Sequence, residues 1–475
     1  MKAGTGGSLA FNDITFVDSG GVRLHSAAVS NGDLFIDAAT NLDVDGALII
    51  TATTGNITQG SELEVGTTST FTTSASNATI TLNDADNTFT GAVALNTNGS
   101  SGNATIKNDR ALLLAASSVG GALIATATAG NITQNGALDI EGITTLVTSG
   151  AGATIDLVTN GSGNAFTSEL LITTNETSSD KDAHVSIDGG TTNLIIGTST
   201  IDGNLTLRSG GTLTDTDSST VTVKGTLTAT TDASHSVITL NDLAVDGAFT
   251  LAPNGTGAVT IVNDAGLNLA ASTMGGTFSG TATTGDISNT GNLAITGAAT
   301  FITTANNRSI ILDQSGNAFT STVTMQAGNG SNATFNNITF VDSAAVRLHS
   351  SAASAGDLYI NASTDLAVGG NLSITATTGN ITQGGALDIE GTTTLVTLAD
   401  NGTIDLKVNG ITNAFTGKLL ITTNDTGSET DGDVEIDGGD TNLIIGASTI
   451  DGDLDLVSGG TITDDGIATV RGTLT

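Results

Sequence analysis

Internal repetition constrains the fold of this chain more than any other feature of its sequence. Residues 1–60 recur at 325–384, and the segment ITATTGNITQG is identical in both copies. A second long repeat relates 126–228 to 375–475. Repetition of this kind is typical of arrays of stacked units, in which each unit contacts mainly its neighbours. We therefore expect one continuous β-solenoid over residues 1–475.

A finer repeat lies beneath the long ones. Gly-led segments of 20, 25, 29 and 22 residues follow one another between residues 46 and 141. Each contains about three short runs of alternating apolar residues, separated by Gly, Asn or Asp. Alternation with a period of two is typical of strands with one inward face, and these corner residues tolerate positive φ. The pattern predicts an all-β parallel β-helix with coils of about 20–30 residues and three short strands per coil.

The composition favours a thin, long core. Aromatic residues make up 3% of the chain, and Pro253 is the only proline among 475 residues. Since Pro lacks the backbone N–H, its scarcity suits a continuous hydrogen-bonded ladder. A β-sandwich array is the alternative fold, but such domains usually keep a core Trp or Tyr. This chain has no Trp, and its one Tyr is Tyr359.

The charge of the chain limits its partners. Twelve Lys and Arg against 47 Asp and Glu give a net charge of −35, which argues against binding to nucleic acid or to anionic lipid. An acidic disordered chain is the alternative, yet 38% of the residues are hydrophobic and fall in short β-branched runs. No stretch approaches the roughly 20 apolar residues of a membrane helix, so we expect no membrane insertion. The first residues, MKAGTGGSLAF, do not resemble a signal peptide, and the lack of cysteine excludes disulfides.

Five phenylalanines occupy matching places in the repeats. They are Phe89 in NTFT, Phe166, Phe319 and Phe415 in NAFT, and Phe249 in GAFT. One interpretation is an exposed ladder on which sugars stack. We favour inward-facing rings, because large apolar groups are usually buried and the flanking Ala and Thr suit such a position.

Acidic clusters occur at 42–46, 214–217, 451–455 and 463–466. Oxygen-rich loops are what Ca²⁺ requires, but the spacing of the EF-hand and the calcium-binding nonapeptide are both absent. We interpret the clusters as solvated carboxylates in turns, and scattered Ca²⁺ binding stays open. The sequence predicts no catalytic residues, no cofactor site and no defined metal site.

The histidines lack an obvious catalytic partner. The motif VRLHS places His25 two residues after Arg23 and, in the second copy, His349 two residues after Arg347. Residues two apart on a strand share a face, so we expect polar pairs on the surface. The remaining histidines are His184 and His235.

The repeat unit GNLSITATTGNITQGGALDIEGTTTLVT at 370–397 resembles the filamentous-haemagglutinin-like exoproteins of bacteria and the passenger regions of autotransporter adhesins. The resemblance covers nearly the whole chain in the style of its repeats. It implies a right-handed parallel β-helix, export across an outer membrane, and a role in adhesion or in a surface layer. The chain departs from that family because it shows no secretion domain, and APNGTG at 252–257 is only similar to part of such a domain's signature. The resemblance therefore assigns no binding residues.

These observations predict a non-enzymatic, extracellular structural or adhesive rod on a bacterial cell surface. We expect it to be a fragment of a larger repetitive exoprotein, because Met1 aligns with Met325 inside a repeat and RGTLT at 471–475 matches KGTLT at 224–228, which continues into further strands. The expected partners are other copies stacked head to tail, adjoining repeats, or glycans and proteins of a host or neighbouring cell.

Two alternative functions stay open. The first is a self-assembling surface-layer, sheath or filament subunit stabilised by divalent cations. The second is a β-helix enzyme that degrades polysaccharides. Such an enzyme needs one cleft in which carboxylates gather, whereas the features of this sequence recur along the chain, so this is the less favoured alternative.

Overall fold

The computed structural model describes residues 13–25, 33–35, 42–175, 182–328, 337–350, 354–360, 366–408, 410–424 and 431–475. These residues form short strands and two 3-10 helices, with no α-helix in the described ranges. The chain divides into two compact units, Met1–Gly247 (unit 1) and Ala248–Thr475 (unit 2). Each unit is an all-β parallel solenoid, and the two contain about 18 turns. The predicted fold class is confirmed, while the continuity of one solenoid across both units stays a prediction.

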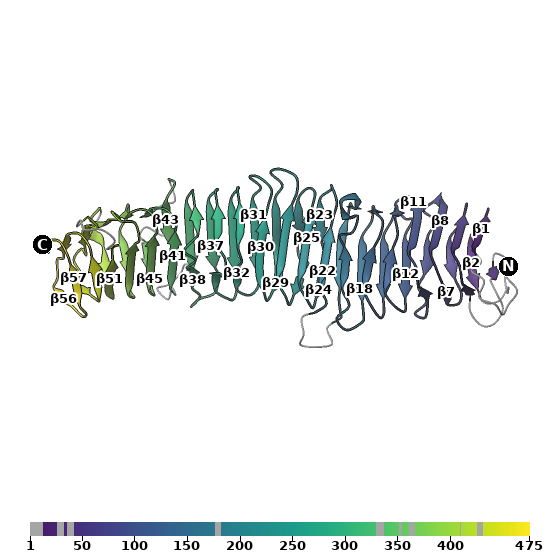
Figure 1. The fold of residues 1–475 in the computed structure, drawn as a ribbon, viewed down its shortest axis with the longest axis horizontal. Helices are drawn as coiled ribbons and strands as arrows, with labels where there is room; N and C mark the ends of the chain where they lie inside the picture. The colour runs from purple at the N-terminus through teal and green to yellow at the C-terminus, as the bar shows by residue number, and fades with distance from the viewer. Residues whose placement is uncertain are drawn as a thin grey trace. The chain divides into compact units, whose positions relative to one another are not determined.

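In unit 1 a turn consists of three strands. One turn contains β15 (Leu123–Ala127), β16 (Ile132–Gln134) and β17 (Leu138–Ile140). The next contains β18 (Thr144–Thr148), β19 (Ile155–Leu157) and β20 (Ala165–Phe166). Each strand pairs in parallel with its counterpart one turn later, so like positions lie in rows (Figure 1).

Unit 2 has the same construction. One turn contains β34 (Phe278–Ala282), β35 (Ile287–Asn289) and β36 (Leu293–Ile295). The next contains β37 (Ala299–Thr303), β38 (Ile310–Leu312) and β39 (Ala318–Phe319). All three pairings are parallel. The expected three strands per coil are therefore present in both units.

Turn length varies more than the sequence predicts. The shortest turns place partner residues 19 positions apart in sequence, as for Ala104 and Leu123. The longest turns pair Val346 with Ile381, 35 residues apart. The expected range of about 20–30 residues is thus slightly too narrow, because the longest turns contain an inserted strand.

The inserted strand is stacked out of sequence order. In unit 2, β43 (Asp357–Ile360) pairs with β40 (Val323–Ala327) on one side and with β42 (Val346–Leu348) on the other, although β42 precedes it in the chain. In unit 1, β3 (Asp33–Phe35) pairs with β2 (Val22–His25) in the same register as β43 pairs with β42 in unit 2, because Arg23 lies beside Asp33 as Arg347 lies beside Asp357. Both copies of VRLHS therefore lie next to a strand formed by residues about ten positions later.

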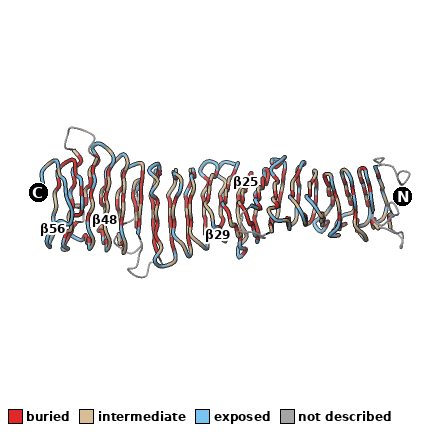
Figure 2. Tube along the Cα trace, turned by 60° about the horizontal axis from the view of Figure 1, so that its bottom comes forward, coloured by how far each residue is buried: buried red, intermediate tan, exposed pale blue. Residues whose placement is uncertain are grey.

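The core is a column of aliphatic side chains. Buried and partly exposed residues alternate along the strands, so each strand contributes every second residue to the interior (Figure 2). One row in unit 1 contains Leu112, Ile132, Ile155, Val185, Leu205 and Leu227. All six are at most 1% exposed. Burial of each such side chain contributes roughly 1.5–3 kcal/mol, so small apolar residues suffice for a stable core when they are stacked in rows.

Candidate functional site

The repeat phenylalanines lie in the core. The exposed fractions are 1% for Phe89 and Phe166, 0% for Phe249, 3% for Phe319 and 2% for Phe415. The rings of Phe89 and Phe319 also contact other core rings, as in the pair Phe301 and Phe319, whose centroids are 6.1 Å apart. The prediction of inward-facing rings is confirmed. No face of these five rings is available for stacking on a sugar.

The asparagine before the phenylalanine joins neighbouring turns. Asn164 is 1% exposed, and its Oδ1 accepts hydrogen bonds from the backbone N–H of Leu138 and from Gln134 Nε2, both at 2.9 Å. Its Nδ2 donates to the carbonyl of Asp188 at 2.8 Å. Asn413 makes the equivalent contacts in unit 2. The Asn-Ala-Phe-Thr motif is therefore a structural motif of the interior.

The arginine of VRLHS pairs with an aspartate of the inserted strand. Arg347 Nε lies 2.6 Å from Asp357 Oδ1, and Arg23 Nη1 lies 3.2 Å from Asp33 Oδ1. The aspartate side chains are 0% and 1% exposed, whereas both arginines are 41% exposed. Sequence reasoning missed these partners, because the pairing depends on the reversed stacking of β42 and β43. In both copies the arginine therefore joins its own strand to the inserted strand.

The histidines occupy separate places on the solenoid. His25 and His349 are half-exposed, in agreement with the predicted surface position. His184 is exposed, and its Nδ1 accepts the backbone N–H of Asn204 at 3.0 Å. His235 adopts a positive φ of 67° in a corner.

Asn and Asp side chains at the corners of the turns form a further set that sequence reasoning missed. The Oδ1 of Asn131 accepts the backbone N–H of Thr154 in the next turn at 2.9 Å. The same hydrogen bond recurs in four further places. The backbone N–H groups of Thr212, Thr226, Thr403 and Thr461 donate to the Oδ1 atoms of Asn193, Asn204, Asn380 and Asn442, respectively. The signal in the sequence is an Asn directly before the Ile or Leu that begins a strand, as in Asn131 and Ile132.

The acidic clusters are distributed over strands and corners. Asp43 of the cluster at 42–46 lies beside Glu64 in the next turn, and Asp455 lies beside Glu435, which lies beside Asp405. Lys407 Nζ contacts Asp455 at 2.5 Å and Glu435 at 3.5 Å. Within the described ranges, no three His, Cys, Asp or Glu side chains are grouped so that they could hold a metal ion.

One acidic cluster lines a groove in unit 1. The cavity has a volume of about 380 Å³ and is lined by Thr167, Ser168, Glu169, Ile195, Thr214, Asp215, Thr216 and Asp217. These residues come from three successive turns and lie in or next to β21 (Glu169–Thr173), β23 (Leu194–Ile196) and β26 (Leu213–Asp215). The groove therefore places residues that are far apart in sequence on one surface.

Asp215 is a partly buried carboxyl group of this groove. Burial raises its pKa, and the nearby charge of Asp242 adds to that rise. Hydrogen bonds from the backbone N–H groups of Asn241 and Asp242 to Oδ2, at 2.7 and 2.8 Å, oppose the shift. Within the described residues, the Oγ1 of Thr216 is buried without a hydrogen-bond partner. The groove thus offers acceptors to a hydrogen-bond donor.

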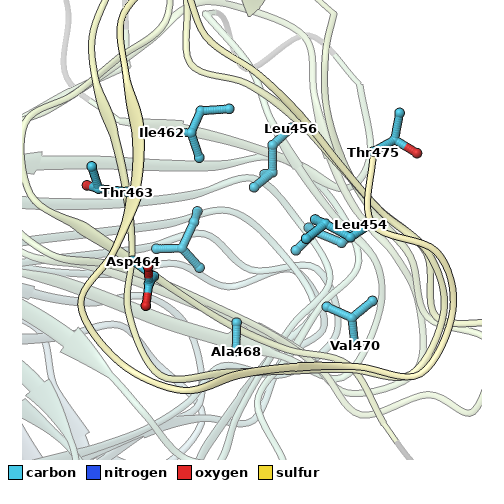
Figure 3. A pocket seen from close by; sticks show the side chains of 10 residues that line it. Leu454, Leu456, Ile462, Thr463, Asp464, Ala468, Val470 and Thr475 are labelled. Atoms are coloured by element: carbon cyan, nitrogen blue, oxygen red, sulfur yellow. The ribbon is translucent and has the colours of Figure 1, made fainter.

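A second cavity, of about 470 Å³, lies at the last turns of unit 2. Leu454, Leu456, Ile462, Ala468 and Val470 surround it (Figure 3). Asp464 is the one titratable residue of its lining, so the surface is mainly apolar. In the first copy of the repeat, the residues that correspond to Leu454 and Ile462 are covered by the following turn. The cavity is thus the solenoid interior at these turns.

The fold and these repeated contacts define the chain as a parallel β-solenoid repeat protein. It belongs to the DUF5649 family, which is described as repeats of unknown function. The matches cover residues 25–96, 101–173, 182–252, 256–326, 335–422 and 431–475. Neither a curated protein nor a solved structure matches the chain. Within the described residues, none of the helices has the length and apolar character required to cross a lipid bilayer.

Proposed function

We propose that the chain is a non-enzymatic structural or adhesive rod on the outside of a bacterial cell. In this proposal it is part of a larger repetitive exoprotein of the filamentous-haemagglutinin-like type. The observation that carries the proposal is the repetition of the same outward-facing residue types from turn to turn. A surface that repeats along a solenoid suits repeated contacts with an extended partner.

The clearest repeated surface lies in unit 2. Thr339, Ser373 and Thr394 form one outward row, and the adjacent row contains Thr375, Val396 and Thr422. Neither row contains a charged residue, although the chain carries a net charge of −35. The hydroxyl groups of the Thr and Ser side chains in these rows can form hydrogen bonds, and the methyl groups of Thr and Val can pack against a ligand. The face therefore suits a neutral, extended glycan.

The location can be tested on the cells that produce the protein. Antibodies against the purified chain should label intact cells as strongly as permeabilised cells, and external protease should remove the label. Labelling that requires permeabilisation would overturn the proposal of a surface protein.

The adhesive role can be tested with charge insertions into the uncharged rows. Thr375→Lys together with Thr394→Lys should lower binding of the purified protein to immobilised neutral glycans by about tenfold or more, since each buried uncompensated charge costs several kcal/mol. Asp264→Lys, at an exposed corner of unit 2, is the control and should bind like the unchanged protein. Equal binding by all variants would exclude this face as the adhesive surface.

A further inference from the structure

A buried exchange of hydrogen bonds between a glutamine and an asparagine joins turns at several places in the chain. Gln134 Nε2 donates to Asn164 Oδ1 at 2.9 Å, and Asn164 Nδ2 donates to Gln134 Oε1 at 3.0 Å. The same exchange joins Gln59 to Asn87 in unit 1 and Gln383 to Asn413 in unit 2. Each side-chain amide thereby donates one hydrogen bond to its partner and accepts one from it.

A further place of this kind, in unit 2, has Asn289 where the others have glutamine. The places are equivalent, because the backbone N–H of Leu293, four residues after Asn289, donates to Asn317 Oδ1 at 3.0 Å, as the residue four after each glutamine donates to its asparagine. Asn289 Nδ2 donates to Asn317 Oδ1 at 2.8 Å and to the carbonyl of Gly291 at 2.9 Å. These two hydrogen bonds fix the orientation of the Asn289 amide. One half of the exchange is therefore present.

The other half of the exchange is not made at Asn289. Its side chain is one methylene group shorter than that of glutamine, so Asn289 Oδ1 does not bond Asn317 Nδ2. Among the residues that the structure describes, neither of these two atoms has a hydrogen-bond partner. Asn289 is 4% exposed and Asn317 is 0% exposed, so bulk solvent does not reach the two atoms. A buried donor and a buried acceptor that both lack a partner are unfavourable unless a bound molecule joins them.

We propose that Asn289 Oδ1 and Asn317 Nδ2 form a binding site for one buried water molecule, which completes the exchange that glutamine makes directly elsewhere. The water accepts the N–H of Asn317 and donates one O–H to Asn289 Oδ1. Its other O–H can be donated to the carbonyl of Leu312, because Leu82, at the same distance before Asn87, accepts a hydrogen bond from that asparagine at 3.3 Å. Three hydrogen bonds are the usual number for a buried water. The proposal is independent of the adhesive role, since it concerns the interior.

Oxygen-17 magnetic relaxation dispersion counts the long-lived water molecules of the full chain and tests the proposal. Asn289→Gln should lower the count by one, because the added methylene group carries the amide oxygen to Asn317 Nδ2. The opposite change, Gln134→Asn, copies the site into unit 1 and should raise the count by one. The control Gln326→Asn makes the same chemical change at a partly exposed residue of β40 and should leave the count unchanged. Circular dichroism shows whether the variants fold.

A high-resolution crystal structure of the unchanged protein gives a second test that needs no variant. It should show one density peak within about 3 Å of both Asn289 Oδ1 and Asn317 Nδ2, the ordinary length of a hydrogen bond to water. No peak between the two atoms would overturn the proposal. The same conclusion would follow if folded Asn289→Gln kept the water count of the unchanged protein, or if Gln326→Asn changed the count as much as Gln134→Asn does.

Discussion

At the scale of single residues, one buried position of the repeat is filled by two different side chains. In unit 1, Asn108 Oδ1 accepts the N–H of Phe89 at 2.8 Å, and its Nδ2 donates to the carbonyl of Ala111 at 2.7 Å. In unit 2, Asp342 accepts the N–H of Phe319 at 3.1 Å. Burial raises the pKa of Asp342, against the lowering effect of its backbone hydrogen bonds. The ionised carboxylate of Asp342 cannot donate a hydrogen bond, whereas the side-chain amide of Asn108 can.

Asp342→Asn should therefore stabilise unit 2 at neutral pH. The pKa of Asp342 is raised in the folded state. The contribution of Asp342 to the free energy of unfolding is therefore fully present below the ordinary aspartate pKa and is lost as the pH rises through the raised pKa. The variant should unfold with a free energy higher by about 1 kcal/mol at pH 7, with a smaller gain at acidic pH. Urea unfolding across pH measures this. The control Asp264→Asn, at an exposed corner, should leave the pH dependence unchanged; a similar gain in both variants would contradict the interpretation.

At the scale of strands and turns, side chains that join turns determine local stability. The side chain of Asn164 accepts two hydrogen bonds and donates three, whereas Asn131 at an exposed corner accepts one backbone N–H. Removal of a buried polar partner costs about 1–3 kcal/mol for each group left unsatisfied. The two asparagines should therefore differ strongly in their energetic contribution.

Asn164→Ala should lower the free energy of unfolding by about 3 kcal/mol, and Asn131→Ala by about 1 kcal/mol or less. Hydrogen exchange of the backbone N–H of Leu138 gives a local readout, because that group donates to Asn164. If the N–H of Leu138 stays protected in Asn164→Ala, the hydrogen bonds of the Asn164 side chain do not hold the neighbouring turns together.

The buried ion pairs permit a matched comparison. Arg347→Ala leaves the fully buried Asp357 without its charge partner and should cost about 3–5 kcal/mol. Arg110→Ala removes a pair with Asp109, which is 34% exposed, and should cost less than about 1 kcal/mol. Thermal unfolding of both variants measures the difference. Equal costs would mean that Arg347 does not anchor the inserted strand.

The sequence predicted some of these elements and not others, for physical reasons. Alternating apolar residues indicate a strand with one buried face, and a Phe between Ala and Thr indicates an inward ring. The strands and the inward position of Phe166 could therefore be predicted. The pair of Arg347 and Asp357 could not, because it depends on a strand stacked against the order of the chain. The groove at Glu169 and Asp215 could not either, since its lining depends on the unequal lengths of successive turns.

At the scale of the whole molecule, the excess of acidic residues governs the response to salt. Asp405, Glu435 and Asp455 lie side by side on neighbouring strands, an arrangement that like charges disfavour. Lys407 bridges two of them, and its hydrogen bond to Asp455 raises the pKa of its amine. With a net charge of −35, repulsion extends over the chain at low ionic strength.

The melting temperature should therefore rise by several degrees between about 0.01 M and 1 M NaCl, as the Debye length falls from about 30 Å to about 3 Å. A melting temperature independent of salt would contradict this account. At matched ionic strength, CaCl₂ and NaCl should act alike. A gain specific to Ca²⁺ would instead favour the assembly stabilised by divalent cations.

Oxidative cross-linking of paired cysteines tests the central claim, that like positions of successive turns lie in register, most directly. The chain contains no cysteine, so introduced pairs have no background. Thr375 and Val396 are partners on neighbouring strands, whereas Thr375 and Thr449 are separated by three strand spacings, or roughly 14 Å. Disulfides need Cα atoms within about 7 Å. In-register stacking predicts that Thr375→Cys with Val396→Cys cross-links and that Thr375→Cys with Thr449→Cys does not; the reverse result, or equal cross-linking of both pairs, would contradict this register.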